Sequence, residues 1–232
     1  MNANGSGQKQ LTHDGSANYY PSVSPDGRYI AFTSTRSGSQ NIWMMDIDGG
    51  NLKQLTNSAD ATWPQWSPDN AWIVYKDYGG GKRTLWKISV NGGAPVQVTE
   101  RYTDWPSVSP DGKLLACMYW DEQLTTQAEL AILPFDGGNP IKTFKFSVAT
   151  QSFTVPNVLH WTPDGRNITY IDDPIGTSNI LSQSLDGGAP KALTQFKSDR
   201  IFWFDWSRDG KTLACARGSM NSDVVLISNL QE

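Results

Sequence analysis

The tetrapeptide Ser24-Pro25-Asp26-Gly27 decides the fold, because the chain repeats it, with small changes, at nearly regular intervals. A self-similar unit of roughly 45 residues is the length of one β-propeller blade of four short strands. The sequence therefore predicts an all-β chain of five four-stranded blades. The five copies begin at Ser24, Ser67, Ser109, Thr162 and Ser207.

The residues around each copy have the pattern of four consecutive strands, a to d. An aromatic stretch such as Trp63–Trp66 precedes the motif, and an alternating stretch such as Tyr29–Phe32 follows it. A third apolar stretch ends at Asp48-Gly49-Gly50 or its equivalent, and a short stretch such as Lys53–Thr56 comes next. Asp-Gly is a strong hairpin signal because both central residues need positive φ. The unit is therefore predicted to be an antiparallel meander.

The motif has the residues of a tight turn between strands a and b. Pro fixes φ, Asp accepts hydrogen bonds from its own turn, and Gly adopts conformations that other residues resist. A metal loop is the alternative, but each copy carries a lone carboxylate without a second acid at calcium-loop spacing. We expect a structural role, with no metal and no cofactor.

The two ends of the chain complement each other. Residues 8–12, Gln-Lys-Gln-Leu-Thr, match the outer strand d, whereas Asp223–Ser228 matches a strand c without a strand d after it. The N-terminal strand is thus expected to complete the last blade and close the ring, so that residues 1–232 form one domain and a monomer. Alternatively, the chain is a fragment of a longer propeller.

Composition excludes several classes of partner. The formal net charge is −4 and the sequence has no run of Lys or Arg, which argues against nucleic-acid and anionic membrane surfaces. No stretch approaches the roughly 20 apolar residues that span a bilayer. Cys117 and Cys215 occupy equivalent Leu-Ala-Cys positions in two repeats, which predicts free, buried thiols rather than a disulfide.

The repeated pattern resembles a known family. Trp63-Pro64-Gln65-Trp66-Ser67-Pro68-Asp69, followed by an Ile-Trp strand, Asp-Gly-Gly and Gln-Leu-Thr, is similar to the TolB-like propeller repeat across essentially the whole chain. The family includes a periplasmic propeller protein, gating propellers of prolyl-oligopeptidase-type proteases, and sensor propellers of bacterial transmembrane serine/threonine kinases. The copies around Thr162 and Ser207 look most like the kinase type. The resemblance implies an extracytoplasmic bacterial module that binds a protein, a peptide or a small polar ligand.

The sequence lacks the motifs of common enzymes. His13 and His160 are the only histidines, and no Gly-x-Ser-x-Gly elbow, phosphate-binding loop or His-Glu-x-x-His pattern occurs. We therefore expect a non-catalytic sensing or interaction module. The alternatives are a substrate-gating propeller of an attached peptidase, and a metal-dependent lactonase or lyase, for which the inner strands offer only His160 and Asp205.

The loops d to a and b to c vary between repeats and share one face, here called the variable face, whereas the a-to-b and c-to-d turns form a uniform face. Because binding residues concentrate on loops of a rigid scaffold, we place the site on the variable face and in the channel. The aromatic residues four positions before the motif have a structural alternative, which is to wedge between blades. The candidate site residues are Tyr20, Trp63, Tyr102, Trp105, Tyr119, Trp120, His160, Trp203 and Asp205.

A second set of candidates lies two residues before the motif. If strand a lines the axis, these polar side chains converge near the central channel, where they hold a small polar ligand, an ion or ordered water. His160 and Asp205 belong to adjacent repeats, so a contact between them is expected, either as a structural hydrogen bond or for proton chemistry. The set is Ser22, Gln65, Ser107, His160 and Asp205.

Overall fold

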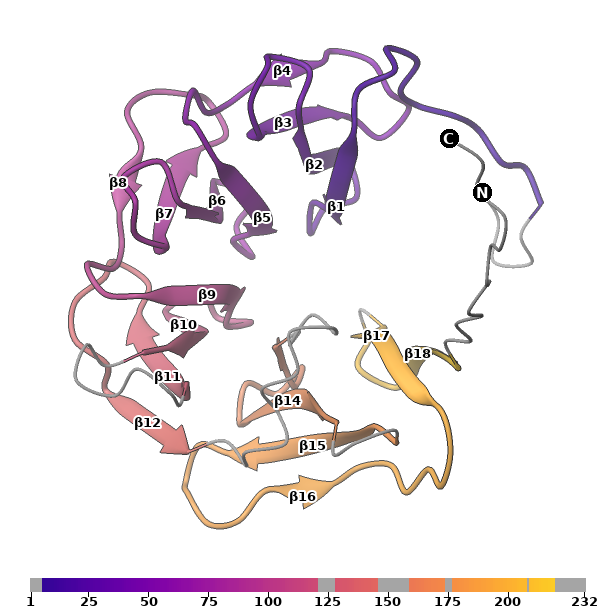
Figure 1. The fold of residues 1–232 in the computed structure, drawn as a ribbon, viewed down its shortest axis with the longest axis vertical. Coiled ribbons are helices and arrows are strands. Elements are labelled where there is room, and N and C mark those ends of the chain that lie inside the picture. The colour runs from indigo at the N-terminus through magenta and orange to yellow at the C-terminus, as the bar shows by residue number, and fades with distance from the viewer. Residues whose placement is uncertain (1–5, 121–127, 146–158, 174–176, 208, 220–232) are drawn as a thin grey trace, which may run out of the picture.

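The structure, a computed structural model, describes residues 6–120, 128–145, 159–173, 177–207 and 209–219. These residues form five antiparallel sheets that follow one another around a common axis, with β1, β5, β9 and β17 toward the centre (Figure 1). The first two sheets are β1 (Asn18–Val23), β2 (Tyr29–Ser34), β3 (Asn41–Asp46) and β4 (Lys53–Gln54), then β5 (Ala61–Trp66), β6 (Trp72–Asp77), β7 (Thr84–Ser89) and β8 (Val96–Gln97).

The third and fourth sheets repeat this order. They comprise β9 (Thr103–Val108), β10 (Leu114–Tyr119), β11 (Glu129–Pro134) and β12 (Lys142–Lys145), then β13 (His160–Trp161), β14 (Asn167–Asp172), β15 (Asn179–Ser184) and β16 (Lys191–Ala192). The fifth sheet contains β17 (Arg200–Trp206) and β18 (Leu213–Gly218) in the described part of the chain. The predicted all-β propeller is confirmed, with four complete blades and the inner half of a fifth. The strand expected at Asp223–Ser228 lies outside the described residues, so ring closure stays a prediction.

The N-terminal segment behaves like an outer strand at one point. Gln10 Nε2 donates to the Thr12 carbonyl at 2.7 Å, as Gln54 does to Thr56 at 2.7 Å and Gln97 does to Thr99 at 2.8 Å. Leu11 packs beside Trp43 of the first blade, against the cluster of Ile30, Phe32 and Met45. The segment therefore repeats the local contacts of strand d beside blade 1.

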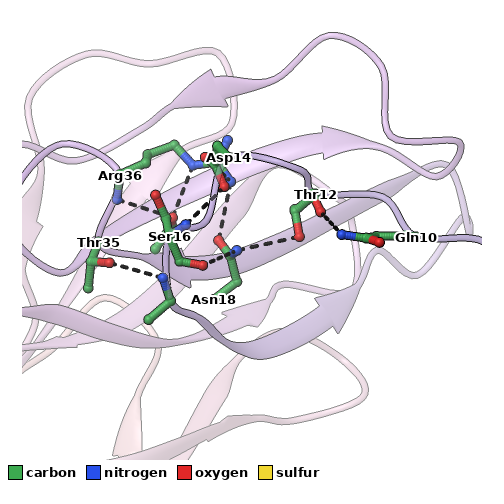
Figure 2. A network of polar contacts seen from close by, with 9 residues as sticks. Gln10, Thr12, Asp14, Ser16, Asn18, Thr35 and Arg36 are labelled. Atoms are coloured by element: carbon green, nitrogen blue, oxygen red, sulfur yellow. Dashed lines mark hydrogen bonds and ion pairs between the residues drawn. The ribbon is translucent and has the colours of Figure 1, made fainter.

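A polar network anchors the same segment to the first blade (Figure 2). The Arg36 guanidinium lies 3.3 Å from the Asp14 carboxylate and donates to Asn18 Oδ1 at 3.2 Å, and its Nε donates to Ser34 Oγ. The Ala17 backbone N–H donates to Thr35 Oγ1. The chain that enters β1 is thus fixed by side-chain hydrogen bonds before the first strand begins.

The hydrophobic core is divided among the interfaces between blades. One cluster joins blades 1 and 2 through Ile42 and Ile73, another joins blades 2 and 3 through Leu85 and Leu115. Two further clusters join blade 3 to 4 and blade 4 to 5. Each sheet is buried only by its neighbours, so the blades stabilise one another in sequence around the ring.

Tryptophans directly before the motif fill these interfaces. Trp66 of blade 2 donates its indole N–H to the Ser22 carbonyl of blade 1 at 2.9 Å, and Trp161 of blade 4 donates to the Ser107 carbonyl of blade 3 at 3.0 Å. Trp206 reaches Thr169 Oγ1 of the preceding blade. These three tryptophans wedge between blades. Among the aromatic residues four positions before the motif, Trp105 also packs at such an interface, whereas Tyr20, Trp63 and Trp203 belong to none of these clusters.

The motif forms the same turn in all five copies. The Ser or Thr hydroxyl donates to the Asp carboxylate at 2.5 to 2.6 Å and accepts the backbone N–H that starts strand b at 2.9 to 3.0 Å. The hydroxyl bond, then the backbone bonds, lower the pKa of each carboxyl. Every carboxylate is therefore used within its own turn.

Other predictions of local structure have mixed outcomes. Cys117 and Cys215 are both free, as predicted. Cys117 is fully buried against Leu115, whereas Cys215 is only partly buried, so the prediction of a buried thiol was wrong for Cys215. Tyr119, one of the candidate site residues, is the last residue of β10 and packs half-buried against the core. Within the described ranges, no helix has the length and apolar character needed to cross a membrane.

Candidate functional site

A backbone irregularity recurs at large aromatic residues of the inner strands. Tyr20, Trp63 and Trp105 each precede a proline and have positive φ values of 52°, 60° and 50°. The pairing between strands a and b shifts register at these three residues and again beside Trp203. Left-handed conformations are uncommon for bulky residues, and a bulge turns a side chain away from its regular direction. The inner strands thus lose regular pairing at the residues that carry these rings.

Three of the rings stack on one another. The Tyr20 and Trp63 centroids are 3.8 Å apart at an interplanar angle of 21°, and those of Trp63 and Trp203 are 6.2 Å apart at 14°. The rings come from blades 1, 2 and 5, so the stack crosses the centre of the propeller. Trp63 is 9% exposed, whereas Trp203 is 37% exposed. Trp203 therefore presents its aromatic surface to solvent.

A cavity of about 390 Å³ lies beside this stack. The channel residues Ser22, Gln65, His160 and Asp205 line it together with Tyr20, Trp63 and Trp203. Val23 and Pro25, which lead into the first motif turn, are also part of the wall. The cavity thus extends toward the uniform face, whereas sequence reasoning placed the site on the variable face and in the channel.

His160 and Asp205 form the polar side of the cavity. His160 Nδ1 lies 3.5 Å from Asp205 Oδ1, and the His160 ring meets Phe204 edge-on at 4.9 Å. Burial lowers the pKa of His160, although Asp205 and a hydrogen bond with the Phe204 backbone act in the opposite direction. The imidazole is therefore neutral at pH 7. Asp205 accepts the Trp206 backbone N–H at 2.8 Å, and its side chain is 64% exposed.

The second nitrogen of His160 is isolated. Nε2 is buried and has no hydrogen-bond partner. A serine nucleophile needs a histidine nitrogen that accepts its proton, and Ser22, although it lines the same cavity, makes no such hydrogen bond. In this structure the Ser22 hydroxyl is therefore not hydrogen-bonded to His160 Nε2.

Acidic groups flank the stack toward the variable face. Burial raises the pKa of the Tyr20 hydroxyl most. The charge of Asp104 is the next cause, and smaller contributions come from Tyr19 and Asp60. Asp104 is itself buried, 3.4 Å from Lys76 and 3.6 Å from Arg83, and burial raises its pKa despite these cations. Asp104 was not among the predicted site residues; an acid directly before Trp105 in an inner strand was the available signal.

The remaining predicted site residues lie elsewhere. Trp105 and Trp120 are half-buried against the core between blades 3 and 4. Tyr119 lines a separate hollow of about 420 Å³ beside Gly137, and Tyr102 is exposed beneath the Lys82 ammonium at 5.6 Å. Ser107 offers its carbonyl to Trp161 and does not line the central cavity. Five of the nine predicted site residues therefore converge and four do not.

The described residues also bear on metal binding. In the ranges that the structure describes, no group of three or more His, Cys, Asp or Glu side chains is placed to hold a metal ion. At the central cavity, His160 and Asp205 are two side chains of these types.

Similar proteins share this architecture. The Agrobacterium fabrum protein named Uncharacterized protein Atu1656 is 27% identical over 170 residues, which cover 71% of this chain and 43% of that protein. The TolB structure from Acinetobacter baumannii superposes with a TM-score of 0.64 at 20% identity, covering 76% of this chain and 43% of that one. An oligogalacturonate lyase from Vibrio parahaemolyticus gives a TM-score of 0.65 at 14% identity over 90% and 62%.

The chain spans less than half the length of the first two of these proteins. At these identities, the two solved structures establish a shared fold. Residues 1–152, more than half of the chain, match the sequence model described as the TolB beta propeller domain. The five repeats, the blade topology and this match agree, and the chain therefore belongs to the TolB beta propeller domain family.

Proposed function

We propose that this chain is a non-catalytic binding module that receives a small polar ligand, or one side chain of a partner protein, in its central cavity. The observation that carries the proposal is the convergence of Tyr20, Trp63 and Trp203 with His160 and Asp205 around about 390 Å³. Ligand sites combine apolar walls with a few polar groups that orient the ligand, and this cavity has both. A cavity of that size accommodates a metabolite-sized molecule.

Strain at the aromatic positions supports a binding role. Positive φ at Tyr20 and Trp63 costs conformational energy that a regular strand avoids, and such costs concentrate at functional sites. The structural wedge between blades is supplied by Trp66 and Trp161, so it does not require the stacked rings. The rings are therefore available for a ligand.

The experiment is a thermal-shift screen of metabolites and short peptides, followed by NMR of the tryptophan indole N–H signals. A ligand of the central cavity should shift the Trp203 signal, and Trp203→Ala should abolish binding while the fold stays intact. Tyr102→Ala is the matched control, because Tyr102 is exposed outside the cavity. Ligands that need Tyr102 but not Trp203 would place the site on the variable face instead.

We further propose that the module belongs to an extracytoplasmic part of a larger bacterial protein, such as a receptor kinase. The family resemblance of the repeats supports this context. The gating propeller of a peptidase is the alternative, and a solved prolyl endopeptidase structure shares the fold, with a TM-score of 0.59 at 16% identity. Sequencing the flanking gene distinguishes the two, since a kinase and a hydrolase domain have different signature motifs.

A further inference from the structure

We infer that the central cavity selects an organic monocation, a guanidinium or an alkylammonium group, which the Asp205 carboxylate and the Trp203 ring hold together. This inference rests on the proposed binding function and names the ligand class of the same site. Three observations carry it: the charge of the lining, the exposed carboxylate and the aromatic surface.

The lining has one sign of charge. Among the described residues that form the wall, Asp205 is the single formally charged group, and neither Lys nor Arg is present. Its ion-pair neighbour is His160, a group that burial keeps uncharged at neutral pH. The carboxylate is consequently not neutralised within the cavity, and it favours a ligand that brings a positive charge.

The aromatic rings strengthen that preference. The faces of indole and phenol rings carry partial negative charge, so a cation placed over them is attracted. Trp203 is 37% exposed and its neighbour in the stack, Trp63, lies nearly parallel to it. Asp205 follows Trp203 by two residues on β17, which places the carboxylate and the ring on one strand. A cation over the ring is therefore within reach of the carboxylate.

The charges around the cavity nearly cancel. Asp60 and Asp104 act on Tyr20 from the other side of the stack, where Lys76 and Arg83 lie beside Asp104. On the uniform face, the sequences of the five motif turns carry five aspartates and five basic residues. The basic residues are Arg28, Lys113, Arg166, Arg208 and Lys211. The cation preference therefore comes from the lining of the cavity itself.

The test compares cations with neutral molecules of the same shape. Acetyl-arginine amide and acetyl-citrulline amide form one matched pair, and choline and 3,3-dimethylbutan-1-ol form another. Binding to the full chain is followed by the Trp203 indole signal, assigned with Trp203→Phe. We expect each cation to bind about 10-fold or more tightly than its neutral partner, which corresponds to the strength of one charge-assisted contact. Preference for the arginine derivative points to a peptide side chain, and preference for choline points to a free alkylammonium.

Two variants locate the effect. Asp205→Asn should weaken cation binding by about 10-fold and leave the neutral molecules unchanged. Asp186→Asn, which removes the same charge from an exposed hairpin between β15 and β16, should change neither. Equal binding of cation and neutral partner, or an Asp205→Asn protein that keeps full cation affinity, would overturn the inference.

The outcomes also separate this inference from the proposed function. If neutral molecules move the Trp203 signal as strongly as cations do, the cavity is a binding site without cation selectivity. If no cation and no member of the broader screen moves that signal, the proposed function itself is wrong.

Discussion

Replacing Trp161 with Phe should destabilise the propeller much more than the same replacement at Trp203. Trp161 is 6% exposed, packs in the cluster between blades 3 and 4, and donates its indole N–H to the Ser107 carbonyl at 3.0 Å. Phe keeps a ring but removes the donor and part of the volume. Trp203 is exposed and stacks on Trp63 without taking part in an interface cluster.

The magnitude follows from these contacts. A buried carbonyl that loses its donor costs about 1 to 3 kcal/mol, and the smaller ring adds a void that costs on the order of 1 kcal/mol. We therefore expect Trp161→Phe to lower the free energy of unfolding by about 2 to 4 kcal/mol. Trp203→Phe should change it by about 0.5 kcal/mol or less, as at other exposed positions.

The assay is urea unfolding at pH 7, followed by circular dichroism, with both variants compared with the parent chain. Trp66→Phe repeats the test at the interface of blades 1 and 2, since Trp66 donates to the Ser22 carbonyl at 2.9 Å. Equal losses for Trp161→Phe and Trp203→Phe would refute the assignment of structural and ligand-binding roles to the two aromatic positions of the repeat.

Four further predictions test the turns, the outer strands and the ring. Gly137→Ala should be far more destabilising than Gly138→Ala. Both glycines have positive φ, but a Cβ on Gly137 would lie 2.6 Å from the Val98 carbonyl oxygen, whereas a Cβ on Gly138 would meet no atom within 4 Å. Similar urea midpoints for the two variants would contradict this. Thr99→Val should cost about 1 to 3 kcal/mol because the Leu85 backbone N–H loses its acceptor, whereas Thr99→Ser should retain most of the stability; calorimetry measures both. The five turn aspartates have lowered pKa values in the folded protein. The stability that they contribute is therefore present above the pKa of an aspartate in the unfolded chain and is lost as the pH falls below about 4. Asp111→Asn should flatten the acid side of the curve of stability against pH, and parallel curves for parent and variant would argue against this. Light scattering should give the 25.6 kDa mass of a monomer, whereas a dimer would indicate unpaired strand edges and an open ring.

The repeat allowed the architecture to be predicted from sequence alone. Ser-Pro-Asp-Gly specifies its turn through local chemistry, in which one hydroxyl and one carboxylate satisfy backbone groups a few residues away. Asp-Gly-Gly likewise limits the hairpin to positive φ at its glycines, as at Gly137 and Gly138. Local interactions of this kind do not depend on the rest of the molecule, which is why five copies were sufficient to predict the blades.

The candidate site was only partly predictable. The position two residues before the motif pointed to His160 and Asp205, because the axis of a propeller brings equivalent residues of neighbouring blades together. Position in the repeat did not distinguish the tryptophans four residues before the motif. Trp105 packs into the core and Trp63 stacks in the channel, and the two share a following proline and a positive φ, so neither feature separates them.

The strand order and the turn chemistry follow from the amino-acid sequence alone, since each depends on neighbours within one repeat. Only the tertiary structure decided which aromatic residues become wedges, which ones stack, and toward which face the cavity extends. These features depend on the packing of blade against blade. The stack of Tyr20, Trp63 and Trp203 joins three blades whose inner strands are far apart in the chain, and no local pattern specifies how their side chains divide the space at the centre.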